Sequence, residues 1–209
     1  MSDKAAVDFF CAERALSPTG FDAAAQVLCT DIACVRAVIE VETGGTGYDT
    51  SGRLKMLFEP HVFYRLLDAL PNKVKLGEAC ANGVAYAAWG ERPYPDNSYP
   101  RLAIASRIDT GAALSACSWG LGQIMGLNYR RLGYTAVIDM IRDAQKSEDV
   151  QLEQMVKFII INGIASCLRE RNWTAFAARY NGSRNVEIYA GRLADAYAKF
   201  TTVVNNEVA

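Results

Sequence analysis

Residues 147–171 read SEDVQLEQMVKFIIINGIASCLRER, and this stretch decides the fold class. Helical patterning runs through it, and the segment FIII at 158–161 puts an apolar side chain on every side of the helix. A helix that is apolar all round lies in a protein core, where other helices pack against it. We therefore predict a helix over 147–171 that is central and buried.

Helical patterning also dominates the rest of the chain. It predicts further helices over 3–15, 20–29, 31–42, 59–70, 101–116, 127–144, 173–180 and 184–203. β-branched alternation is scarce, and only residues 53–58 are typical of a short strand. Residues 90–100 contain three of the six prolines, which predicts a surface loop. The expected fold class is mostly α, a compact domain around one central helix, with at most a very small β element.

The composition limits the classes of protein to which the chain can belong. It has 209 residues, of which 51% are hydrophobic and 22% are charged, as in an ordinary globular domain. The formal net charge is −1, so no general basic field is present to hold nucleic acid or an anionic membrane. The most apolar window, 156–168, is too short and too polar to span a bilayer. We expect a monomer with no nucleic-acid partner and no stable membrane insertion.

The six cysteines and the one histidine do not form a metal-binding pattern. The chain has no Cys-x-x-Cys, and His61 is its only histidine, so zinc-ligand spacing is absent. We predict neither a metal nor another cofactor. The thiols are expected to be mainly free and buried, as unpaired cysteines usually are.

Two glutamates close the predicted helix over 31–42, and a helical wheel separates them. Glu42 falls within the apolar arc, and Glu40 lies about 160° away, on the polar side next to Arg36. Glu42 also ends the helix, where the helix dipole disfavours negative charge. Burial and the dipole both raise the pKa of the Glu42 carboxyl, and a glycosidase general acid requires a carboxyl that is protonated near neutral pH. The alternative is a helix-end glutamate that only turns into the loop at 43–45.

A second carboxylate, Glu59, directly precedes Pro60 at a predicted helix start. In one interpretation Glu59 caps the helix or compensates its dipole. In the other interpretation it faces Glu42 across a cleft. The glycine-rich loop at 44–47 lies between the two in the sequence, and it either lets the backbone approach a ligand closely or is a flexible connection.

Two further segments combine glycine, aromatic and amide residues, namely 118–126 (SWGLGQIMG) and 178–182 (ARYNG). The first is no dinucleotide fingerprint, because a methionine occupies the third glycine position. Aromatic rings beside amides suit sugars, which stack their apolar faces and form hydrogen bonds through their hydroxyls. Trp119, Tyr129 and Tyr180 are candidates for this role, and the alternative for each ring is a place in the core.

The order of these segments resembles that of the lysozyme-like superfamily of goose-type lysozymes and lytic transglycosylases. A helix ending in Glu-Thr-Gly-Gly is followed by Gly-x-Gly-Gln-Ile-Met and then by Tyr-Asn-Gly. More closely, the chain resembles the N-acetylmuramidase family of bacteriophage endolysins. The matching stretches are 37–42, 56–63, 116–120, 123–126 and 178–182. Together these stretches extend the resemblance over most of the chain.

The resemblance implies a lysozyme-like domain that cleaves the β-1,4 bond between N-acetylmuramic acid and N-acetylglucosamine in peptidoglycan. Glu42 matches the catalytic glutamate of the family, in agreement with the helical wheel. Gln123, Tyr180 and Asn181 match cleft-lining positions of the family, and we add Ser118 to the substrate-binding candidates.

Hydrolysis also needs a group that positions the attacking water, and the candidates are Glu59, Asp49 and Asp109. The sequence does not give the separation of the carboxylates, so retaining and inverting outcomes both stay open. Lytic transglycosylation to 1,6-anhydro products needs no second carboxylate and is the nearest alternative. A non-catalytic wall-binding or phage structural module is the other.

The resemblance also predicts domain organisation and location. We expect residues 1–209 to form a single catalytic domain, because too few residues precede the match for a separate peptidoglycan-binding module. The N-terminus lacks the pattern of a signal peptide. This fits an enzyme of phage-induced lysis that is made in the host cytoplasm and reaches the periplasmic cell wall after release by a separate membrane-permeabilising protein.

Overall fold

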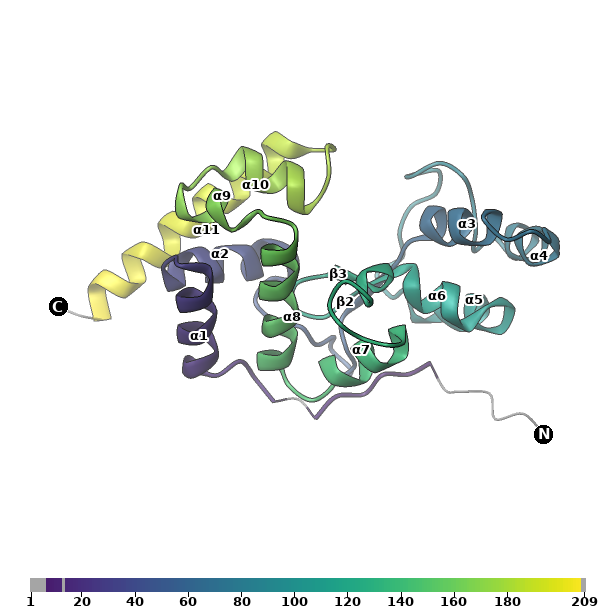
Figure 1. The fold of residues 1–209 in the computed structure, drawn as a ribbon, viewed down its shortest axis with the longest axis horizontal. Helices are drawn as coiled ribbons and strands as arrows, with labels where there is room; N and C mark the ends of the chain where they lie inside the picture. The colour runs from purple at the N-terminus through teal and green to yellow at the C-terminus, as the bar shows by residue number, and fades with distance from the viewer. Residues whose placement is uncertain (1–6, 13, 208–209) are drawn as a thin grey trace.

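The computed structural model describes residues 7–12 and 14–207, and this part of the chain is mostly helical (Figure 1). The helices are α1 (Pro18–Leu28), α2 (Ile32–Thr43), α3 (Pro60–Asp68), α4 (Val74–Ala81), α5 (Tyr99–Ile108), α6 (Thr110–Ser115), α7 (Val137–Ala144), α8 (Glu148–Ile161), α9 (Ala165–Arg169), α10 (Trp173–Tyr180) and α11 (Val186–Glu207), with one 3-10 turn, η1 (Gly126–Asn128). The mostly α fold class is confirmed.

One small antiparallel sheet lies in the middle of the molecule, with β1 (Met56–Phe58), β2 (Cys117–Trp119) and β3 (Ile124–Met125) in that order. Leu57 pairs with Ser118, and Ser118 pairs with Met125. The strand predicted over 53–58 is therefore confirmed in its second half. Strands β2 and β3 were not predicted, because they are too short to show alternation.

Two hydrophobic cores divide the fold into lobes. The first core contains residues of the sheet and of α3 to α7, and we call this part the sheet lobe. The second contains residues of α1, α2 and α8 to α11, and we call this part the helical lobe. In Figure 1 the sheet and α8 lie between α2 and α11 on one side and α3 to α6 on the other.

Helix α8 holds the central place that the sequence predicts, but it is shorter and less buried. It packs against α1, α7 and β3, and Met155 and Ile159 are fully buried. Ile160 and Ile161, by contrast, are 47% and 39% exposed, so the helix is not covered on every side. It ends at residue 161, where Gly163 takes a positive φ of 66° and separates α8 from α9.

Polar side chains of α8 fix the loops around it. The buried carboxylate of Glu148 accepts hydrogen bonds from the backbone N–H of Leu16 (2.9 Å) and of Gly47 (2.7 Å). The buried amide of Gln151 accepts one from the Leu121 N–H (2.9 Å). These bonds hold the glycine-rich loop and the turn between β2 and β3, so the glycines at 44–47 belong to a fixed loop and line neither of the cleft cavities described below.

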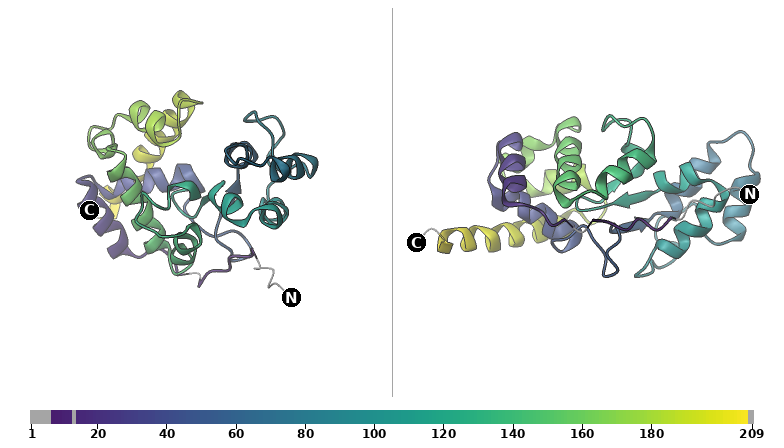
Figure 2. Two further views of the ribbon diagram at one scale, coloured as in Figure 1. Left: turned by 45° about the vertical axis from the view of Figure 1, so that its right-hand side comes forward. Right: turned by 90° about the horizontal axis from the view of Figure 1, so that it is seen from below.

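The helix predicted over 3–15 is wrong wherever the structure describes it; residues 3–6 and 13 lie outside the described residues. Residues 7–12 form an extended segment that runs past α7 and α8 (Figures 1 and 2). The Leu54 N–H donates to the Phe9 carbonyl (2.8 Å), and the Cys11 N–H donates to the Gly52 carbonyl (3.0 Å). Pairing with a distant segment therefore replaces the local helical hydrogen bonds that the pattern predicted.

Two other predicted helices are interrupted. The helix over 101–116 divides at Asp109, whose extended backbone ends α5 and whose side chain caps α6. Over 127–144 only 137–144 is α-helical, because the preceding residues form turns with Gly133 at a φ of 92°. Helix α4 was not predicted, because Ala79 is its one buried residue and the segment shows little periodicity.

The described residues test two further expectations, one about the cysteines and one about membrane-spanning helices. Cys34, Cys117 and Cys167 are free and buried, whereas Cys29 and Cys80 are free and exposed, so the expectation of mainly buried thiols is met only in part. No helix of the described chain combines the length and the apolar composition needed to cross a membrane.

Candidate active site

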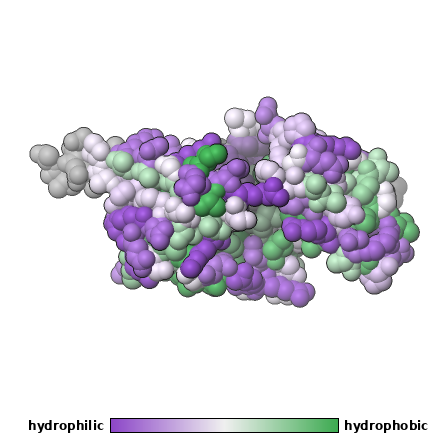
Figure 3. All heavy atoms as spheres, turned by 90° about the horizontal axis from the view of Figure 1, so that it is seen from above, coloured by the Kyte–Doolittle hydropathy of each residue, from purple (hydrophilic) through white to green (hydrophobic). Residues whose placement is uncertain are grey.

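A cleft opens between the two lobes and brings the two predicted carboxyl groups together. One cavity in it, of about 450 Å³, is lined by Glu42 at the end of α2 and by Glu59 at the start of α3. Seen from above, the surface is hollowed between the lobes, and hydrophilic residues border the hollow (Figure 3). The second interpretation of Glu59, a carboxylate facing the cleft of Glu42, is the one that the geometry supports.

The position of Glu42 follows from how α2 begins and ends. Asp31 caps the helix by accepting a hydrogen bond from the Cys34 N–H (2.8 Å), and Gly44 ends it in the left-handed region at a φ of 67°. The side chain of Glu42 is half-buried, and its Oε1 accepts a hydrogen bond from the Asn181 amide (3.1 Å). Burial raises the pKa of the Glu42 carboxyl to about 7, and the Asn181 bond only partly opposes this.

Glu40, two residues earlier, lies in a different environment. Its carboxylate forms an ion pair with Lys199 of α11 (3.1 Å). The predicted neighbour Arg36 instead places its guanidinium over the ring of Phe21, 4.8 Å from the centroid. The helical wheel therefore separated the two glutamates correctly, but Glu40 pairs with Lys199 of α11 and not with Arg36, its neighbour on the wheel.

Glu59 occupies the N-cap position of α3, yet its side chain makes no capping hydrogen bond. The carboxylate turns into the cleft, where Oε2 accepts a hydrogen bond from the Tyr94 hydroxyl and lies 3.3 Å from Nδ1 of His61. Burial raises the pKa of Glu59, while the Tyr94 hydrogen bond and the charge of Arg65 lower it. Burial and the charges of two arginines also lower the pKa of His61 below 6.5, so its imidazole is neutral at pH 7.

The predicted substrate-binding residues all line the cavity of Glu42. The Ser118 hydroxyl donates to Oε1 of Gln123 (2.9 Å), and the Gln123 amide donates to the Gly120 carbonyl (2.9 Å). The Tyr180 hydroxyl donates to the Gly122 carbonyl (2.7 Å). Local hydrogen bonds therefore fix these groups before any ligand binds.

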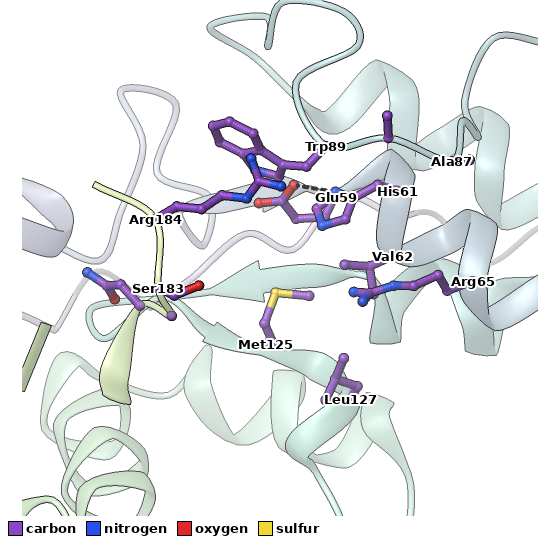
Figure 4. Close-up of a pocket in the computed structure, with 13 residues that line it drawn as sticks. Glu59, His61, Val62, Arg65, Ala87, Trp89, Met125, Leu127, Ser183 and Arg184 are labelled. Carbon is purple, nitrogen blue, oxygen red and sulfur yellow. Dashed lines mark ion pairs between the residues drawn. The ribbon is translucent and has the colours of Figure 1, made fainter. Parts of the chain in front are cut away.

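Several residues of the cleft were not predicted. Trp89 is 44% exposed and lines the cleft, and the Arg184 guanidinium lies over its ring, 4.9 Å from the centroid (Figure 4). Tyr94 and Tyr189 line the same cavity. Residues 90–100 were predicted as a surface loop, and the aromatic residues Trp89 and Tyr94 near its start were the available signal for a sugar site.

Two of the three aromatic candidates are not in the cleft. Trp119 is 2% exposed, and its indole N–H donates to the Leu114 carbonyl (3.1 Å), so it belongs to the core of the sheet lobe. Tyr129 follows η1 and accepts a hydrogen bond from Arg130 (2.8 Å); it lines neither cleft cavity. Of the three, only Tyr180 lines the site.

Two carboxylates named as candidates for positioning water have structural roles elsewhere. Asp49 is paired with Arg53 (2.8 Å). Asp109 caps α6 and is paired with Lys75 (2.8 Å). Their hydrogen bonds and the neighbouring cations lower both pKa values, and neither carboxylate lines the cleft cavities. Among the candidates, Glu59 is the one that shares a cavity with Glu42.

The described residues contain no group of three or more His, Cys, Asp or Glu side chains that could hold a metal ion. A helical fold with a cleft between two lobes, one carboxyl whose pKa is raised to about 7 and one hydrogen-bonded carboxyl is the arrangement of a glycosidase with a lysozyme-like fold.

Comparison with known proteins gives the family. The model of the N-acetylmuramidase family matches residues 31–201, so the chain belongs to this family and is a glycoside hydrolase that acts on peptidoglycan. Among solved structures, the chain is similar to a Burkholderia AP3 phage endolysin, with 35% sequence identity and a TM-score of 0.77 over 91% of this chain and 72% of that one. No curated protein sequence matches the chain.

Proposed function

We propose that Glu42 is the general acid that cleaves the β-1,4 bond between N-acetylmuramic acid and N-acetylglucosamine. The observation that carries this proposal is the half-buried Glu42 carboxyl, whose pKa of about 7 keeps much of it protonated at neutral pH. In the reaction Glu42 donates its proton to the glycosidic oxygen while the bond from the muramic acid C1 to that oxygen breaks. The sugar passes through an oxocarbenium-like transition state.

Glu59 is proposed to act on the water that completes hydrolysis. Tyr94 donates a hydrogen bond to Oε2 and Nδ1 of His61 lies 3.3 Å from the same oxygen, whereas no described group donates a hydrogen bond to Oε1. Oε1 can therefore accept a proton from water as the water oxygen attacks C1. A second carboxylate in the same cavity favours hydrolysis over transglycosylation, in which a hydroxyl of the sugar itself attacks.

The remaining groups of the cleft suit a sugar chain. Ser118, Gln123 and Asn181 offer polar atoms fixed by their own hydrogen bonds, which lowers the entropy lost when a ligand binds. Tyr180 and the exposed Trp89 offer aromatic faces for the apolar side of a sugar ring.

For the biological role, we propose that this one domain acts as a monomer in phage-induced lysis. The similarity to a phage endolysin supports this role. The enzyme would reach the periplasmic wall of the host after release by a separate membrane-permeabilising protein.

Mass spectrometry of digested peptidoglycan tests the reaction. Purified walls incubated with the protein should release fragments with reducing N-acetylmuramic acid ends. Predominantly 1,6-anhydro fragments would instead establish transglycosylation, and intact walls would point to a non-catalytic module.

A further inference from the structure

A second cavity continues the cleft beyond Glu59, and the proposed reaction makes no use of it. It has a volume of about 620 Å³ and shares part of its wall with the cavity of Glu42. The shared residues are Glu59, Trp89, Met125, Asn181 and Arg184. A ligand bound beside Glu42 therefore has a direct path into this second cavity.

Two arginines flank the second cavity from opposite sides. Arg65 comes from α3 in the sheet lobe, and Arg184 comes from the segment between α10 and α11 in the helical lobe. Figure 4 shows the Arg184 guanidinium beneath Trp89 and the Arg65 guanidinium turned back toward Val62, inside the cavity. Both side chains are exposed, and neither forms an ion pair with an acidic residue of the described chain.

The charges of the cavity do not cancel. Glu59 is the one acidic residue among the described residues that line it, and its carboxylate already accepts a hydrogen bond from Tyr94. His61 is neutral at pH 7, since burial and the two arginines lower its pKa. Two guanidinium groups against one carboxylate leave a positive charge, so the cavity favours an anion.

We propose that this second cavity binds a carboxylate of the peptide that N-acetylmuramic acid carries in peptidoglycan. The inference rests on the proposed function, because a muramyl residue must occupy the cleft. The peptide is attached to the lactyl group of that sugar, on the same ring as the scissile C1–O bond, and it bears free carboxylates along its length. An arginine binds a carboxylate through short, charge-assisted hydrogen bonds, often two at once.

The apolar part of the cavity fits the same ligand. Val62, Ala87 and Leu127 line it between the two arginines, and Leu127 is 44% exposed. Such side chains can cover the methyl and methylene groups of a short peptide, while the guanidinium groups bind its acid groups. The enzyme is therefore specific for glycan strands whose peptides keep their carboxylates free.

The test compares two substrates that differ in the charge of their peptide carboxyl groups. Glycan strands with intact peptides are first acetylated at their free amines, and one half is then coupled to methylamine, which converts the free carboxylates into neutral methylamides. Reducing ends are measured for the wild-type protein, for Arg65→Gln and Arg65→Lys, and for Arg107→Gln, which removes an exposed arginine of α5 that lines neither cavity.

The wild-type protein should show a higher kcat/KM on the strands with free carboxylates. Arg65→Gln should lower that preference about tenfold, as expected when a charge-assisted hydrogen bond is lost, and Arg65→Lys should restore part of it. Arg107→Gln should leave the preference unchanged.

Equal kcat/KM of the wild-type protein on both substrates would overturn the inference while leaving the muramidase function intact. An Arg65→Gln preference equal to that of Arg107→Gln would do the same. Absence of reducing ends from both substrates would refute the proposed function and the inference together.

Discussion

Glu42 and Glu59 face one cleft from different lobes, and their surroundings differ. Glu42 receives a single hydrogen bond, from Asn181, and has no ion pair within the described chain. Glu59 accepts a hydrogen bond from Tyr94, and the charge of Arg65 also stabilises its ionised form. Burial raises the pKa of both carboxyls; the rise is opposed by one hydrogen bond in Glu42 and by a hydrogen bond and a positive charge in Glu59. Two residues of the same type can divide the work of acid and base because their environments push their pKa values apart.

The largest effect is expected for Glu42→Gln, because the amide keeps the shape of the side chain but cannot donate a carboxylic proton. Activity should fall by about 10³–10⁴-fold, at the upper end of what general acid assistance contributes. Turbidity clearance of permeabilised Gram-negative cells measures the loss. Glu40→Gln is the matched control, since it removes only a surface pair with Lys199 and should keep most activity. An inactive Glu40→Gln beside an active Glu42→Gln would reverse the assignment.

A smaller loss is expected for Glu59→Gln. The amide oxygen can still accept the Tyr94 hydrogen bond, but the NH2 group in place of the second oxygen cannot take up a proton from water, so kcat should fall about 10²-fold. The measurement is reducing-end release from purified glycan strands.

Asp109→Asn serves as the control for Glu59→Gln, because asparagine also caps a helix and the residue lies outside the cleft. It should leave kcat unchanged. Unchanged kcat in Glu59→Gln would remove Glu59 from the mechanism and bring back a reaction with one carboxylate.

The comparison of the two lobes also shows which features of the site can be predicted from neighbouring residues in the sequence. The place of Glu42 on its helix could be predicted, because a wheel and a capping residue depend only on neighbours within a few turns. The resemblance pointed to Gln123, Tyr180 and Asn181, to which Ser118 was added, and all four line the cavity of Glu42.

The missed features depend on contacts between distant segments. Trp89 and Arg184 meet across the cleft although they are far apart in the chain, and no periodic pattern indicates such a contact. Trp119 has the composition of a sugar platform but lies in the core, because its strand packs inside the sheet lobe. Residues 7–12 pair with residues 52–54 instead of forming a helix, for the same reason.

The pH dependence of kcat/KM should reflect the ionisation of both glutamates. Glu42 must carry its proton, so activity should fall above about pH 7, approaching tenfold per pH unit. Glu59 must be ionised, and because its pKa is raised, the acidic limb should lie above pH 4.5. In Glu59→Gln the acidic limb should disappear while the alkaline limb stays. An alkaline limb that also disappeared in this variant would mean that Glu42 does not control it.

The smallest effect is expected for stability. In the folded protein Glu42 holds its proton up to a pH of about 7, whereas in the unfolded chain it ionises near 4.5. The folded state therefore binds more protons between these values, and the free energy of unfolding should fall as pH rises through this window and level off above it. The shift corresponds to at most about 3 kcal/mol. The free energy of unfolding of Glu42→Gln does not fall in this window. Its Tm should therefore exceed that of the wild-type protein by several degrees at pH 8, and the difference should shrink toward pH 4.5. Glu59 titrates in both proteins and cancels in the comparison. A Tm difference that did not change with pH would show that the helical lobe does not disfavour the ionised form of Glu42.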